Sequence, residues 1–167
     1  MNISDEVIVV ADLRERVLTE VKHAMKQKAA IRLATLRLIN AAIKDKEIAS
    51  RVNGETPPIL EADILAILGK MVKQRLESAR AYEEAGRLDL SERERAEIVI
   101  VEEFLPKQLT GAEVEAAITA AITETDAASI RDMGRVMGVL KAAYTGQMDF
   151  GSVGPMIKQR LCAPSSG

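Results

Sequence analysis

The run from Glu61 to Ala85 constrains this chain most, because it predicts one long helix. Its apolar residues recur at intervals of three and four, which places them on one side of a helix. They are Leu65, Leu68, Val72, Leu76 and Ala79, with Ile64 and Met71 widening the stripe. A helix of roughly 24 residues is about 36 Å long, so shorter helices can pack along it. Gly86 follows, where a left-handed residue often ends a helix.

Six further segments show helical spacing, and none shows the alternation of apolar and polar residues that is typical of a strand. Their expected starts or caps are Asp12, Ala30, Ser91, Thr110, Ser129 and, for the last one, Asp149 or preferably Ser152. Ser91 and Thr110 each stand three residues before a glutamate, which is the pattern of a capping box. Pro106 should stop the fourth helix, and Pro155 should lie in the first turn of the last one.

The expected fold is therefore all-α. An N-terminal bundle of about four helices should occupy residues 1–106, and a small three-helix module should occupy residues 107–167. Aromatic residues make up only 2% of the 167 residues, so aliphatic side chains must fill both cores.

Composition excludes several classes of site. One histidine and one cysteine cannot supply the usual zinc ligand sets, and the phosphate-binding glycine motifs and the G-x-S-x-G nucleophile motif do not occur. We therefore expect no catalytic residue, metal or cofactor. The first residues lack the basic start and cleavage site of a signal peptide, and no apolar run is long enough to cross a membrane. A cytoplasmic protein without a membrane partner is expected.

Basic residues supply the candidate binding site, although the net charge is −2. Arg37, Lys44 and Arg51 recur every seven residues, which places them on one helix face with Asn40 among them. Further candidates are Lys73 and Arg75 on the long helix and Arg131, Arg135 and Lys141 near the C-terminus. Such residues either contact the phosphates of a nucleic acid or form an ordinary solvated face.

Two glycines stand four residues apart on the sixth predicted helix. Gly134 and Gly138 each cost about 1 kcal/mol relative to alanine in a helix interior, so something should approach the backbone closely there. Close packing of another helix is one explanation, and contact with a ligand or an RNA backbone is the other.

Several motifs together resemble the GatB/YqeY family, specifically its stand-alone YqeY-like proteins. The resemblance covers almost the whole chain. It rests on the runs 37–44, 73–75, 85–87, 105–109 and 133–138, which read RLINAAIK, KQR, AGR, LPKQL and MGRVMG.

The resemblance implies a helical bundle followed by a small helical module. The same unit forms the tail of the B subunit of the glutamine-dependent aminoacyl-tRNA amidotransferase, where it is associated with holding tRNA. It implies an accessory protein that binds tRNA or another RNA. Two alternatives stay open: carbon–nitrogen ligase activity with glutamine as amide donor, and a protein-interaction module.

Overall fold

The computed structural model describes residues 13–162, and this part of the chain is helical. Its α-helices are α2 (Leu13–Lys26), α3 (Ala30–Ala49), α4 (Glu61–Glu84), α5 (Leu88–Glu102), α6 (Gly111–Thr125), α7 (Met133–Tyr144) and α8 (Phe150–Cys162), with a 3-10 turn η1 (Ile130–Asp132) before α7. Over these residues there is no strand, only an isolated bridge between Val52 and Glu55. The all-α prediction is confirmed. The expected cap at Asp12 and the expected absence of a signal peptide concern residues outside the described range.

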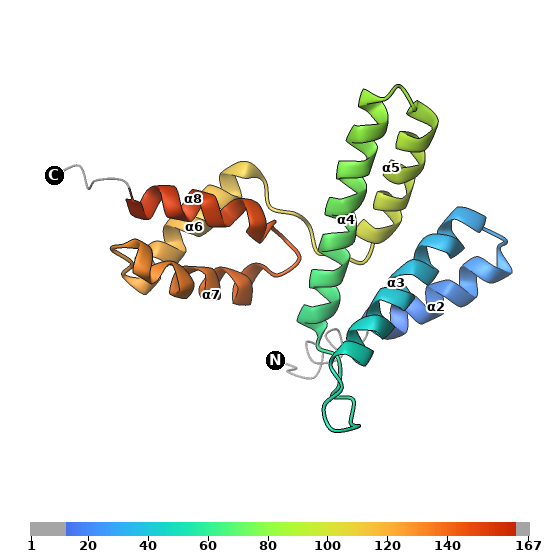
Figure 1. The fold of residues 1–167 in the computed structure, drawn as a ribbon, viewed down its shortest axis with the longest axis horizontal. Helices are drawn as coiled ribbons and strands as arrows, with labels where there is room; N and C mark the ends of the chain where they lie inside the picture. The colour runs from blue at the N-terminus through green and yellow to red at the C-terminus, as the bar shows by residue number, and fades with distance from the viewer. Residues whose placement is uncertain (1–12, 163–167) are drawn as a thin grey trace, which may run out of the picture. The chain divides into compact units, whose positions relative to one another are not determined.

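The chain divides into two compact units, residues 1–105 and residues 106–167. In the described part of the first unit, α2 and α3 form one antiparallel hairpin and α4 and α5 form another (Figure 1). The buried core of this unit comes from all four helices: Leu13, Val17, Ala24, Leu36, Ile39, Ile43, Ile64, Leu68, Met71, Val101 and Phe104. The second unit packs α6, α7 and α8 around a core of its own, which includes Ile118, Leu140 and Ile157.

The long helix α4 has the expected bounds, but it is rotated relative to the expected stripe. Its buried residues are Ile64, Leu68, Met71 and Ala79, whereas Leu65, Val72 and Leu76 are only half-buried. Gly86 has a φ of 73°, which confirms the left-handed residue expected after the helix.

Two expected helix starts are wrong. The fourth helix begins at Leu88 and not at Ser91, whose buried hydroxyl donates to Glu83 Oε1 at 2.8 Å. The last helix begins at Phe150, directly after Asp149, so Asp149 and not the preferred Ser152 precedes it, and Pro155 is its sixth residue and not part of its first turn. The capping box at Thr110 is confirmed, and so is the expected start at Ser129, which directly precedes η1.

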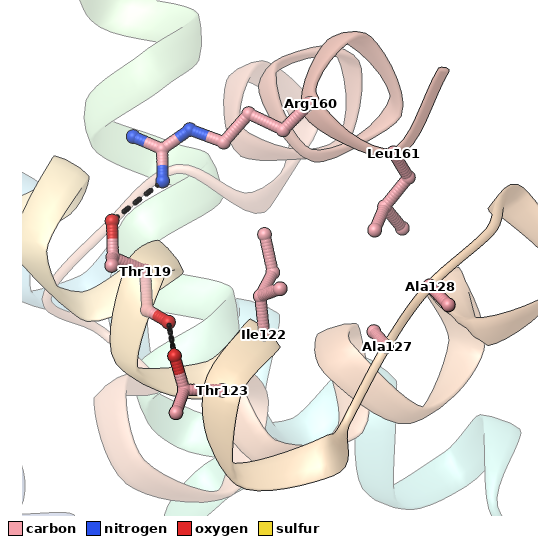
Figure 2. A pocket seen from close by; sticks show the side chains of 7 residues that line it. All are labelled: Thr119, Ile122, Thr123, Ala127, Ala128, Arg160 and Leu161. Atoms are coloured by element: carbon pink, nitrogen blue, oxygen red, sulfur yellow. Dashed lines mark hydrogen bonds between the residues drawn. The ribbon is translucent and has the colours of Figure 1, made fainter. Parts of the chain in front are cut away.

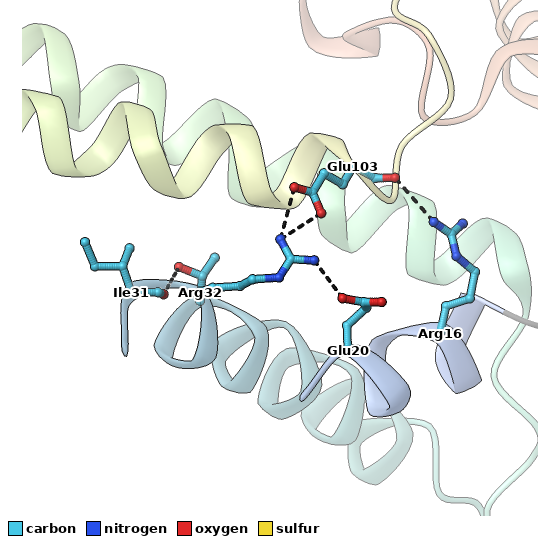
Figure 3. A network of polar contacts seen from close by, with 6 residues as sticks. Arg16, Glu20, Ile31, Arg32 and Glu103 are labelled. Atoms are coloured by element: carbon cyan, nitrogen blue, oxygen red, sulfur yellow. Dashed lines mark hydrogen bonds and ion pairs between the residues drawn. The ribbon is translucent and has the colours of Figure 1, made fainter. Parts of the chain in front are cut away.

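A polar network around Arg32 joins three helices of the first unit (Figure 3). From α3, Arg32 donates to Glu20 of α2 at 2.8 Å and to Glu103, just after α5, at 3.0 Å. The hydrogen bond from Arg32 lowers the pKa of Glu20 below its usual value. Arg16 lies 5.3 Å from the centroid of the Phe104 ring, which adds a cation–π contact. The network thus connects both hairpins.

Candidate nucleic-acid interface

The strongest grouping of the predicted site residues lies on α7 and the turn before it. Three basic residues and two glycines are exposed there and fall on one side of the helix by their spacing. We call this surface the α7 face; it consists of Arg131, Gly134, Arg135, Gly138 and Lys141. The opposite side of α7 carries Val136 and Leu140, which are fully buried in the core of the second unit.

The two glycines leave the helix backbone open. A Cβ added at Gly134 or Gly138 would meet no atom within 4 Å among the described residues. The expectation that another helix packs closely against them is therefore wrong within this part of the chain. Contact with a ligand or an RNA backbone at these two glycines stays a prediction.

Asp132 holds one of the three cations of the α7 face. Its carboxylate accepts the backbone N–H of Ala128 at 2.9 Å and of Ser129 at 3.0 Å, and it pairs with Arg135 at 2.5 Å. The hydrogen bond from the Ala128 backbone, followed by that from Arg135, lowers the pKa of Asp132 to about 2. Arg131 and Lys141, by contrast, have no acidic partner between residues 13 and 162.

The predicted basic line on α3 is only partly available. Arg37 and Lys44 are exposed and have no ion-pair partner among the described residues. Arg51 lies beyond the end of α3 and donates from Nε to Thr56 Oγ1 at 3.0 Å. Asn40 is half-buried, and its Oδ1 has no hydrogen-bond partner in the described structure.

Arg75 does not lie on an open basic surface. Its Nε contacts Glu97 Oε2 of α5 at 3.0 Å, and the two side chains are 13% and 12% exposed. Arg75 follows the buried Met71 by four residues and the buried Leu68 by seven, a spacing that places it on the packed side of α4. It is held by Glu97 between the helices, while Lys73 of the same helix is exposed.

A hollow of about 530 Å³ lies between α6 and α8 in the second unit (Figure 2). Arg160 reaches across it and donates to Thr119 Oγ1 at 2.7 Å, and it also pairs with Glu115. The hydroxyls of Thr119 and Thr123 donate to carbonyls of α6. Its polar groups are thus already partnered within the unit, so the hollow is a weaker candidate than the α7 face.

The described residues contain no group of three or more histidine, cysteine, aspartate or glutamate side chains that could hold a metal ion. Between Leu13 and Cys162, no helix is long and apolar enough to span a membrane.

The chain is similar to known proteins over most of its described length. The profile of the Yqey-like protein family matches residues 14–161. A protein of Clavispora lusitaniae named "Altered inheritance of mitochondria protein 41, mitochondrial" is 35% identical over 86 residues, which are 52% of this chain and 47% of the relative. Its namesake in Meyerozyma guilliermondii is 37% identical over 86 residues, 52% of this chain and 42% of the relative.

An uncharacterized protein of Schizosaccharomyces pombe is 29% identical over 97 residues, which are 58% of this chain and 72% of that protein. In the proteins of Clavispora lusitaniae and Meyerozyma guilliermondii, the matched segment is less than half of the relative's length. The family profile, however, covers nearly all of the described residues, and this chain belongs to the YqeY-like protein family.

Proposed function

We propose that this chain is an RNA-binding accessory protein, that tRNA is its leading ligand, and that the α7 face contacts the phosphates. The observation that supports this most is the combination of unpaired cations with an open backbone. Arg131 and Lys141 lack acidic partners in the described structure, and Gly134 and Gly138 have no atom near the position of a Cβ. A phosphate can therefore approach the helix more closely than side chains would otherwise allow.

Charge is also segregated between the helices of the second unit. α6 carries Glu113, Glu115 and Glu124 and no basic residue, whereas α7 and α8 carry four basic residues and no acidic one. The four are Arg135, Lys141, Lys158 and Arg160. A polyanion is steered toward a local excess of positive charge even when the protein as a whole is slightly negative.

The test is the affinity of the full chain for tRNA as a function of salt. Two phosphate contacts, from Arg131 and Lys141, predict a loss of about 12-fold in affinity between about 50 and 200 mM salt, because each contact releases bound counterions. Arg131→Gln and Lys141→Gln should each weaken binding and reduce the slope of log affinity against log salt by about 1.

Lys107→Gln is the matched control, because Lys107 is an exposed cation of the same unit that lies outside α7 and α8. It should leave the salt slope unchanged. Undetectable binding at low salt would refute the proposal. An equal loss of tRNA affinity in all three variants would show that the α7 face is not the binding surface.

Carbon–nitrogen ligase activity is the alternative that the family resemblance implies, and it has a separate test. We expect no product when the purified chain alone is assayed for glutamine-dependent amidation of charged tRNA. The cytoplasmic location also stays a prediction, and the word "mitochondrial" in the names of two relatives makes mitochondria the second compartment to test by fractionation.

A further inference from the structure

A second exposed surface lies on α3, in the first unit. On the side opposite its core residues Leu36, Ile39 and Ile43, this helix carries residues spaced alternately by three and four. We call this row the α3 seam; it consists of Ile31, Ala34, Leu38, Ala41, Asp45 and Ile48, all exposed. Ile31 is 51% exposed, Leu38 50% and Ile48 59%. These three large aliphatic side chains lie in one row, and an exposed apolar row can serve as a docking surface for a partner.

The spacing of the seam is that of a coiled-coil helix. Alternation of three and four residues is the a and d pattern of a heptad, which packs knobs-into-holes against a second helix. Ala34 and Ala41 stand at alternate positions between the larger side chains, so a partner helix can approach closely. Asp45 is the one polar residue of the row, and a polar residue at a single core position restricts register at a cost in stability.

Charge beside the seam indicates what kind of helix fits. Arg37 and Lys44 each precede a seam residue by one position, so both stand at g positions of the same heptad. Neither has an ion-pair partner in the described structure, although other arginines of this unit, such as Arg14 and Arg32, pair with acids. Residues at g positions pair with opposite charges at the e positions of a facing helix.

We infer that the α3 seam docks an amphipathic helix of another protein that carries aliphatic core residues and acidic e positions. The apolar row supplies the buried area, and Arg37 and Lys44 select the acidic partner. This inference is independent of the RNA proposal, because it concerns residues of the other unit and is tested with other variants.

The first test uses synthetic four-heptad peptides with leucine at the core positions. One peptide has glutamate and the other has lysine at every e and g position, and binding to the full chain is measured by fluorescence anisotropy. The glutamate peptide should bind the wild-type chain at least about tenfold more tightly than the lysine peptide. In the double variant Arg37→Glu/Lys44→Glu the preference should invert.

Leu38→Ser should weaken binding of the glutamate peptide by about 10- to 100-fold, because it removes one buried leucine from the contact. Val99→Ser is the control, since Val99 is a 61% exposed aliphatic residue on α5 and should not contribute. Equal binding of both peptides, a preference that does not invert, or an unchanged affinity of Leu38→Ser would each overturn the inference.

A second test identifies the natural occupant. A photocrosslinking amino acid at position 38 of the full chain is activated in cells, and the crosslinked segment is sequenced. A heptad segment of another protein with acidic e positions supports the inference. An RNA adduct, or a segment from a second copy of this chain, would overturn it.

Discussion

Replacing Gly138 with alanine should make the protein more stable. Gly138 is the sixth residue of the 12-residue helix α7, and the added Cβ meets no atom within 4 Å. Alanine in a helix interior is favoured over glycine by about 0.8–1.0 kcal/mol, because glycine loses more backbone entropy on folding. With no clash to offset this gain, we expect the free energy of unfolding to rise by about 1 kcal/mol. Gly134 lies in the first turn, so Gly134→Ala should gain less.

The measurement is urea-induced unfolding followed by circular dichroism, supported by thermal scans. In a unit of about 60 residues, 1 kcal/mol corresponds to a rise of about 4–8 °C in the melting temperature of that unit. Gly86→Ala is the control with the opposite expected sign. Gly86 has a φ of 73°, and a left-handed conformation costs an alanine about 1–2 kcal/mol.

The same variants also test the proposed function. If an RNA backbone approaches the open glycines, Gly138→Ala should lower the affinity for tRNA while it raises stability. A lower stability of Gly138→Ala would refute the reasoning, because it would mean that another part of the protein fills the space beside this glycine.

Three further predictions follow from the packing and the charges. An NMR titration should give Asp132 a pKa of about 2. Because the folded value is lowered from 3.8, the contribution of Asp132 to stability is complete at neutral pH and is lost as the pH falls from about 4 through 2. Asp132→Asn should abolish this acid-dependent part of the stability. Leu36→Ala should lower the free energy of unfolding by about 2–5 kcal/mol, since Leu36 is fully buried, whereas the exposed Leu38→Ala should change it by less than about 0.5 kcal/mol. Arg32→Met should cost about 1 kcal/mol at low salt and less at high salt, as measured by urea unfolding, because the network is partly exposed; an effect that does not depend on salt would contradict the ionic explanation.

Much of the fold could be predicted because its signals are local. Periodic aliphatic residues indicated the helices, and the capping box at Thr110 and the left-handed Gly86 indicated where two of them begin or end. Ser91 shows where local signals fail. It has the residues of a capping box, but the helix already begins at Leu88 and packs Ser91 against Glu83 of the preceding helix.

The candidate site was predictable only in part, because sequence does not reveal which side of a helix meets a neighbour. On α4, the row of residues through Leu65 and the row through Ile64 are both largely apolar. The packing of α4 against α5 determines which of the two rows is buried. Arg75 then points toward Glu97 and not toward solvent. The cations and glycines of the α7 face share one helical spacing, so their position on one side of the helix could be predicted, while their contact with RNA stays a prediction.

The contact between Arg75 and Glu97 has a consequence for how such sequences diverge. The two side chains meet between α4 and α5, where little water can reach them. Loss of Glu97 would leave the Arg75 guanidinium without its acidic partner, whereas Glu97 has a second partner in Arg93 at 3.5 Å. Accepted substitutions at position 97 should therefore occur together with a change at position 75, either as an exchanged pair of opposite charges or as a joint replacement by apolar residues. Aligned family members should show this covariation, while positions 37 and 44 should vary with the sequence of whatever helix they bind.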